Sequence, residues 1–143
     1  MRIHEVLHGK SSQDVITISP DASVRELLAL LAEHNVGALV VSRDGTLVDG
    51  IVSERDVVRR LHGDENALEG PVSGIMTAEV ATCEPDTSTE DLMVLMTERR
   101  IRHVPVVRGG ALAGIVSIGD VVKSRMSQLE FERDQLDSYV HQT

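Results

Sequence analysis

The chain has almost no aromatic residues. Its 143 residues include one Phe, one Tyr and no Trp, and the two aromatics, Phe131 and Tyr139, both lie near the C-terminal end. Proteins that bind single-stranded nucleic acid stack the bases on aromatic rings, so residues 1–130 offer no such platform. A hydrophobic core in that region must be built from Val, Ile, Leu, Ala and Met side chains.

Cysteine, long apolar runs and positive charge are also scarce. The single Cys cannot form an intramolecular disulfide, which fits a reducing compartment, and we expect a cytoplasmic protein. No apolar run approaches the roughly 18–20 residues of a membrane span, and no apolar stretch typical of a signal peptide follows the first residues. Lys and Arg number 14 against 23 Asp and Glu, and the net charge of −9 disfavours nucleic acid and anionic membranes as partners.

The chain does contain an internal repeat. Residues 15–21, VITISPD, reappear as residues 80–86, VATCEPD. Later in each unit, residues 50–58, GIVSERDVV, match residues 114–122, GIVSIGDVV, at seven of nine positions. Because each unit alone would leave an apolar sheet face exposed, we expect the two to pack together with approximate two-fold symmetry.

Each repeat predicts the element order β-α-β-β-α. A short β-rich run ends at a Pro, and an S-x-x-E/D capping sequence, starting at Ser23 or Ser88, then opens an amphipathic helix. Two apolar strands follow, and the second ends at Ser53 or Ser117 before a final helix. The fold class is therefore α+β, with two packed repeats and a C-terminal helical extension.

We divide the chain into three parts. Residues 1–70 hold the first repeat with its lead-in and linker, residues 71–127 the second repeat, and residues 128–143 the extension. The linker itself is expected at residues 63–73, where Gly, Asp, Asn and Pro are concentrated.

The third strand of each repeat ends in a Gly-Ile-Val-Ser-x-x-Asp motif. Ser with Asp three residues later can close a capping box that satisfies the helix amides with no ligand. Asp is shorter than the Glu or Gln preferred there, which favours acceptance from an outside hydroxyl pair instead. The helix N-terminus also suits a phosphate, and Gly50 or Gly114 would permit close approach of the backbone to that ligand. Both interpretations stay open at the level of the residues.

The repeated unit and its motifs resemble a tandem pair of CBS domains, the Bateman module. The resemblance rests on the two Gly-Ile-Val-Ser-x-x-Asp motifs and on residues 102–106, RHVPV, and it covers residues 8–127. It implies a pseudo-symmetric pair that binds adenosine-containing ligands, such as AMP, ADP, ATP or another adenosyl compound, in clefts between the repeats.

The resemblance also implies the residues of each cleft. Asp56 with Ser53, and Asp120 with Ser117, would hold the ribose or phosphate. The residues expected to flank the base are Thr17, Ile18, Ala38, Leu39, Thr82, Cys83, His103, Val104 and Pro105. The first repeat reads Gly-Ala-Leu-Val where the second reads Arg-His-Val-Pro, so the two clefts are expected to differ.

Most of the remaining His, Cys and Arg residues are expected to have no functional role. The string His4-Glu-x-x-His8 matches a zinc-protease motif, but Gly9 follows at once, so we expect no metal site. Cys83 aligns with the apolar Ile18 and is expected to be a buried, inert thiol. The arginines are solvated charges by default; Arg55, inside the motif, is expected to bind phosphate. Arg99, Arg100 and Arg102 are further candidates for phosphate contacts, which they would make across the pseudo-two-fold.

The end of the chain predicts a partner surface. Val122, Met126, Leu129, Leu136 and Val140 follow a 4-3 spacing that Arg133 interrupts. The interruption and the short length favour docking on a partner subunit, with Phe131 and Tyr139 as anchors, over a free-standing coiled coil. The alternative is a solvated helix that packs on its own globule.

These observations predict a stand-alone regulatory or sensing module that binds an adenosyl ligand, forms a homodimer, acts on an unidentified protein target and needs no cofactor. No nucleophile, base or metal set is assembled in the sequence, so no enzyme activity is expected. The alternative is a ligand-free dimerisation module in which both motifs serve only as helix caps.

Overall fold

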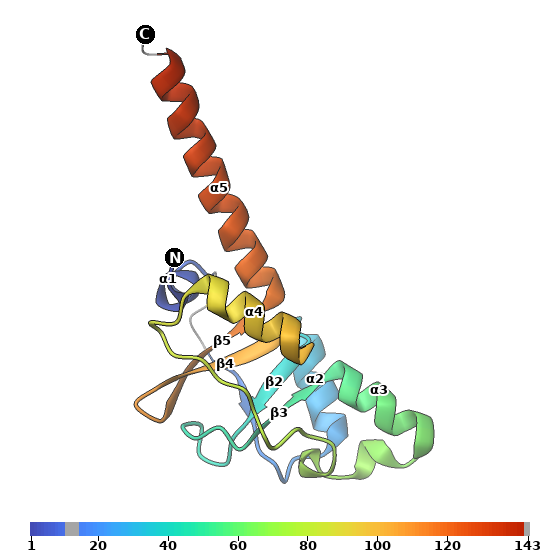
Figure 1. Ribbon diagram of the computed structural model, residues 1–143. Helices are drawn as coiled ribbons and strands as arrows, with labels where there is room; N and C mark the ends of the chain where they lie inside the picture. Colours follow the sequence, from blue (N-terminus) through green and yellow to red (C-terminus); the bar gives the residue numbers. More distant parts are fainter. Residues whose placement is uncertain (11–14, 142–143) are drawn as a thin grey trace.

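The computed structural model describes residues 1–10 and 15–141 and confirms the α+β class with two repeated units and a C-terminal helix. Figure 1 shows the two halves side by side and the last helix projecting from them. The helices and strands are α1 (Ile3–His8), β1 (Thr17–Ile18), α2 (Val24–His34), β2 (Ala38–Val41), β3 (Gly50–Ser53), α3 (Glu54–Gly63), α4 (Thr89–Arg99), β4 (His103–Arg108), β5 (Ala111–Ser117) and α5 (Ile118–His141), with 3-10 turns η1 (Ala67–Glu69) and η2 (Val72–Gly74) between α3 and α4.

The sheets of the two halves are not equal. In the first half β1 runs parallel to β2, and β2 pairs antiparallel with β3. In the second half β4 and β5 form an antiparallel pair, and the strand expected at residues 80–83 is reduced to a single bridge between Cys83 and Val106. The prediction of a full strand there was wrong.

The missing strand has a cause at Pro105. Its equivalent in the first repeat is Val40, which pairs with Thr17 of β1. Proline has no amide hydrogen, so Pro105 cannot donate to an incoming parallel segment. The ladder keeps only the bonds on either side, from Cys83 N to Pro105 O at 3.0 Å and from Val107 N to Cys83 O at 2.8 Å.

The two amphipathic helices begin as the sequence predicts. Ser23 Oγ accepts from the Glu26 amide at 3.1 Å, and Ser88 Oγ accepts from the Asp91 amide at 3.1 Å. Each cap satisfies one amide that the helix itself leaves unpaired. The equivalent residues Leu27 and Leu92 are then both fully buried, one in each half.

Each half's core includes the lead-in of the other repeat. Ile3 and Val6 of α1 are buried in the core of the second half, together with Leu92 and Val104. In the opposite direction Val72, which precedes the second repeat, is fully buried in the core of the first half. The division of the chain into parts that end at residues 70 and 127 stays a prediction. Each hydrophobic core contains side chains from both sides of the boundary at residue 70.

The supposed linker is packed rather than loose. The Val72 amide donates to Ala22 O at 2.8 Å, and Ser23 and Pro71 form an antiparallel bridge. The segment that joins the repeats thus also contributes to the first half, where Ala67 and Val72 are buried.

The glycines of the two motifs lie against these lead-ins. A Cβ on Gly50 would lie 2.7 Å from Met76 Sδ and 2.9 Å from Thr77 O, and one on Gly114 would lie 2.9 Å from Leu7 Cδ2. The expected close approach at these glycines is thus made by the other repeat's lead-in. The assignment of that approach to a ligand was wrong.

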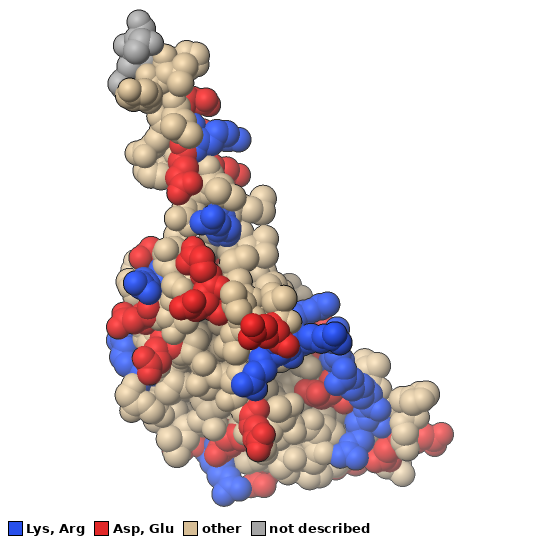
Figure 2. Space-filling model, viewed as in Figure 1, with Lys and Arg blue, Asp and Glu red and all other residues tan. Residues whose placement is uncertain are grey.

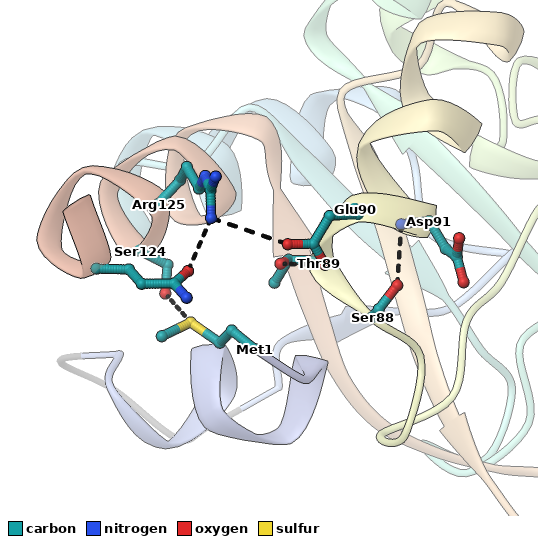
Figure 3. A network of polar contacts seen from close by, with 8 residues as sticks. Met1, Ser88, Thr89, Glu90, Asp91, Ser124 and Arg125 are labelled. Atoms are coloured by element: carbon teal, nitrogen blue, oxygen red, sulfur yellow. Dashed lines mark hydrogen bonds and ion pairs between the residues drawn. The ribbon is translucent and has the colours of Figure 1, made fainter. Parts of the chain in front are cut away.

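Polar contacts fix the N-terminal end against α4 and α5. Figure 3 shows Ser124 Oγ donating to Met1 Sδ at 2.9 Å and Arg125 facing Glu90, with 3.9 Å between Nη1 and Oε1. The Thr89 amide also donates to Met1 O at 3.0 Å. These contacts add to the apolar packing of α1 in holding it on the second half.

Most of α5 extends beyond the globule. Only Val121 of this helix is buried, and the remainder runs outward as a single rod (Figure 1). The five seam residues named above are between 45% and 66% exposed. In the described part of the chain, no helix combines the length and apolar character needed to cross a membrane.

Candidate functional site

Two hollows lie at the junction of the repeats, one beside each Ser-x-x-Asp motif. The first cleft has a volume of about 270 Å³ and the second about 500 Å³. Both are bordered by Gly37, Ala38 and His103, so the two clefts are neighbours. The first cleft is further lined by Ile51, Ser53, Glu54, Arg55, Asp56, Arg59, Thr77, Arg100, Ile101 and Arg102, and the second by Lys10, Ile16, His34, Asn35, Val36, Leu39, Ile115, Ser117 and Asp120.

In the first cleft the motif lies where β3 passes into α3. Asp56 Oδ2 accepts from the Ser53 amide at 2.8 Å and from Ser53 Oγ at 3.1 Å, and Ser53 Oγ accepts from the Asp56 amide at 3.4 Å. The pair forms a complete capping box. Both contacts to the carboxylate use Oδ2, which leaves Oδ1 of this half-buried group for a donor in the cleft.

In the second cleft the same motif carries an additional cation. Asp120 Oδ2 accepts from the Ser117 amide at 2.9 Å, and the Asp120 amide donates to Ser117 Oγ at 3.1 Å. Lys10 Nζ lies 3.1 Å from Asp120 Oδ2 and also donates to Ile115 O at 2.9 Å. Sequence reasoning missed Lys10 because it precedes the repeat and is 110 residues from its partner.

Lys10 and the cap set the charge state of Asp120. Burial raises the pKa of this carboxyl, but the Ser117 amide and Lys10 outweigh it and hold the pKa below its ordinary value. Asp120 is therefore ionised at neutral pH. It can accept from a ligand hydroxyl without first losing a proton.

The argument from the length of Asp was wrong. Both Asp56 and Asp120 reach the amide of their cap Ser, at 2.8 and 2.9 Å, although Glu or Gln is the usual partner in a capping box. Capping and ligand binding are thus compatible here, because one carboxylate oxygen suffices for the cap.

His103 lies between the two clefts. It begins β4 opposite Ser117 and occupies the position of Ala38, its equivalent in the first repeat. Burial lowers the pKa of His103, although Asp120 and Glu54 oppose that shift. The ring is neutral at pH 7 and borders both clefts, whereas the equivalent Ala38 offers no polar side chain.

Four arginines border the first cleft, and all four are exposed to solvent, as the sequence predicts. Arg55 and Arg59 come from α3, and Arg100 and Arg102 come from the segment between α4 and β4 of the other repeat. Figure 2 shows basic side chains gathered over α3 and the end of α4. The sequence signal was the density of Arg at residues 99–102, but the packing of the repeats decides which of them face the cleft.

Some predicted site residues lie outside both linings. Ser53, Arg55, Asp56, Ala38 and His103 border the first cleft, and Leu39, Ser117 and Asp120 border the second. The others, Thr17, Ile18, Thr82, Cys83, Val104 and Pro105, border neither, and their contact with a base stays a prediction.

Three of those residues have side chains in the cores. Ile18 belongs to the first core, and Cys83 and Val104 to the second. Burial raises the pKa of the Cys83 thiol to about 11, so it is protonated at neutral pH and is a weak nucleophile.

The comparison with known proteins agrees with this geometry. A model of the CBS domain matches residues 5–63 and 72–127. The CBS domain-containing protein YhcV of Bacillus subtilis is 36% identical over 113 residues, which are 79% of this chain and 80% of that protein. The crystal structure of the CBS-domain containing protein ATU1752 from Agrobacterium tumefaciens is 43% identical, with a TM-score of 0.82, and the match covers 87% of this chain and 99% of that one.

Another similar protein was crystallised with adenosyl ligands. The CBS domain pair of protein MJ0100, in complex with 5′-methylthioadenosine and S-adenosyl-L-methionine, is 25% identical with a TM-score of 0.76, covering 86% of this chain and 98% of that one. The two matched ranges coincide with the two repeats, and the chain belongs to the CBS domain family.

Proposed function

We propose that this CBS pair is a regulatory module that binds adenosine-containing ligands in its two clefts and has no catalytic activity of its own. The observation that carries the proposal is the paired arrangement of Asp56 and Asp120. Each carboxylate is fixed by its cap at the start of a helix, borders a hollow and keeps one oxygen for an outside donor. Two adjacent ribose hydroxyls are donors that suit such an oxygen.

The solved CBS pair of MJ0100 supports the choice of ligand class, because that protein was crystallised with two adenosyl compounds. Within this class we propose AMP, ADP or ATP as the ligand, since cations border both clefts. Hydrolysis is not part of the proposal. Among residues 1–10 and 15–141 no group of three or more His, Cys, Asp or Glu is placed to hold a metal ion.

Asn substitutions separate ligand binding from helix capping. In Asp56→Asn and Asp120→Asn the amide oxygen can still accept from the cap Ser, while the outward-facing NH₂ can no longer accept from a ribose hydroxyl. We expect thermal unfolding without ligand to change little. Affinity for AMP should fall about ten- to hundredfold, the range for losing a hydrogen bond of about 1.5–3 kcal/mol to a charged group.

The matched control is Asp91→Asn. It has the same Ser-x-x-Asp spacing, and Ser88 caps its helix, yet it borders neither cleft. Titration calorimetry with AMP on the three variants checks the assignment. Equal affinities for all three and for the unsubstituted protein contradict it.

A second function is favoured by one observation: each motif satisfies its own cap without a ligand. A pure scaffold would then gain no stability from nucleotides, whereas a binding module gains RT ln(1 + [L]/Kd). Thermal shift with AMP, ADP, ATP and S-adenosylmethionine separates the two. Mass spectrometry of small molecules released on denaturation identifies any ligand that copurifies.

We also propose that the protein is a homodimer held by α5. The seam residues Val122, Met126, Leu129, Leu136 and Val140 follow a heptad-like spacing on a helix that leaves the globule, and Arg133 occupies one core position. A polar residue at such a position fixes register in helix pairs. Association with a second copy would remove these exposed apolar side chains from water, which favours the dimer.

Sedimentation of the full chain tests this assembly. Leu136→Glu should shift the protein from dimer to monomer at micromolar concentration, while Gln135→Glu, which adds the same charge beside the seam, should not. A monomeric unsubstituted chain would disprove the proposal.

A further inference from the structure

The first cleft has an excess of unpaired positive charge. Four arginines and two carboxylates, Glu54 and Asp56, border it. In the second cleft the corresponding groups are Lys10 and Asp120, which form an ion pair at 3.1 Å. The two clefts thus differ by two net positive charges, in a chain whose net charge is −9.

The four arginines of the first cleft form no ion pairs with carboxylates in the described part of the chain. Over the described ranges, 1–10 and 15–141, no ion pair or side-chain hydrogen bond engages Arg55, Arg59, Arg100 or Arg102. Neighbouring Arg60 differs, because its guanidinium donates to Gly74 O. Like charges gathered at one rim repel one another, so the arrangement favours an anion from outside.

Arg100 has an unfavourable backbone conformation for its residue type. It ends α4 with φ 54° and ψ 45°, in the left-handed region. The equivalent residue, Asn35, ends α2 with φ 52° and ψ 50° and borders the second cleft. Asn adopts this conformation at a lower energetic cost than Arg, so backbone preference does not favour Arg at position 100. An arginine at this position is therefore better explained by a role of its side chain in the cleft.

The origin of the four side chains gives the geometry of the site. Arg55 and Arg59 lie one helical turn apart on α3, and Arg55 follows the N-terminus of that helix directly. Arg100 and Arg102 approach from the other repeat. The hollow itself, at about 270 Å³, is slightly smaller than most ligand pockets, which span roughly 300–1,000 Å³. A whole nucleotide therefore has to extend onto this arginine rim.

We propose that the first cleft selects nucleotides with a di- or triphosphate chain, and that Arg100 of the second repeat binds the distal phosphates. This inference rests on the proposed function and adds its ligand specificity. Guanidinium groups bind phosphate oxygens in pairs of hydrogen bonds. A longer phosphate chain spans more of the rim and engages more arginines. Nucleic acid is disfavoured by the net charge and by the carboxylates in the same cleft.

The test is titration calorimetry with adenosine, AMP, ADP, ATP and inorganic triphosphate, without divalent cations. Affinity should rise from AMP to ATP at one site per chain. Arg100→Asn should lower the affinity for ATP about tenfold or more and change the affinity for adenosine little. Because Asn suits the backbone at 100, this variant folds at least as well, which its thermal unfolding verifies. Arg99→Gln, which removes the same charge from the adjacent residue outside the lining, should leave the ATP affinity unchanged.

The outcomes separate the two proposals. If adenosine and AMP bind but ATP binds no more tightly, the polyphosphate inference is overturned and the adenosine-binding function stands. If Arg99→Gln weakens ATP as much as Arg100→Asn, general charge explains the binding and the role of Arg100 is rejected. If inorganic triphosphate binds in an Arg100-dependent way while adenosine compounds do not compete, the inference stands and the proposed adenosine ligand is rejected.

Discussion

The two halves of this molecule share a motif but not its surroundings. Ser53 with Asp56 and Ser117 with Asp120 form equivalent caps, with amide-to-carboxylate distances of 2.8 and 2.9 Å. Around them, the first cleft has a rim of arginines and the second an ion pair to Lys10. Duplication of a unit therefore preserves what the unit's own backbone needs, while the clefts diverge through residues contributed by other segments.

The largest expected effect tests whether the halves unfold as one unit. Leu27→Ala and Leu92→Ala remove equivalent, fully buried side chains, and each should lower the free energy of unfolding by about 2–5 kcal/mol. Since the lead-ins interlock the two cores, urea unfolding followed by circular dichroism should show a single transition in both variants. Two separate transitions in either variant would contradict this expectation and show that the two halves unfold independently.

A smaller effect tests the exchanged lead-ins. Ile3→Val removes one methylene-sized group from the second core and should cost about 0.5–1.5 kcal/mol. Hydrogen exchange should then accelerate at Val104 and Val106 of the second half more than at Val40 and Val41 of the first. Uniform acceleration would mean that α1 stabilises both halves alike.

Exchanging the residue types at the two left-handed positions, 35 and 100, should change the free energy of unfolding in opposite directions. Arg100→Asn should raise the free energy of unfolding, and Asn35→Arg should lower it, each by up to about 1 kcal/mol, because an L-residue in this region costs about 1–2 kcal/mol and Asn less. Chemical denaturation of both single variants measures the difference. The same sign for both would show that side-chain contacts, not backbone preference, decide stability at these positions.

The ion pair of the second cleft predicts a pH dependence. The folded-state pKa of Asp120 lies below the ordinary value of 3.8, so its contribution to stability is present above that pH and is lost as the pH falls through the folded pKa. Urea midpoints measured from about pH 5 to about pH 2 should fall more steeply for the unsubstituted protein than for Asp120→Asn. Lys10→Gln should move the pKa of Asp120 upward in a carboxyl NMR titration; an unchanged pKa would exclude Lys10 as a cause.

The smallest effect concerns the incomplete sheet. Pro105→Val restores an amide that can donate to residue 81, as Val40 pairs with β1 in the first half. One backbone hydrogen bond contributes about 0.5–1.5 kcal/mol, and the greater freedom of the unfolded chain offsets part of it. The clearer measurement is hydrogen exchange, in which the new amide at 105 should be protected. Rapid exchange there would assign the missing strand to another cause.

Most of the fold followed from local pattern. The 65-residue repeat, the caps at Ser23 and Ser88 and the strands before Ser53 and Ser117 were all predictable, because hydrophobic periodicity and capping act between residues close in sequence. The local pattern predicts a strand at residues 80–83 and does not anticipate its absence. Its cause, Pro105, acts on a segment some twenty residues away, and only the pairing register shows which amide is absent.

The sequence by itself determined the repeat, its element order and the position of each Ser-x-x-Asp motif at a helix start. Tertiary structure alone decided that each motif glycine faces the other repeat's lead-in, that Lys10 lies at Asp120 and that Arg100 and Arg102 border the cleft of Asp56. The physical reason is the range of the interactions. Caps and periodicity are encoded within a few residues, whereas the composition of a cleft depends on which surfaces meet when two halves bury their apolar faces together.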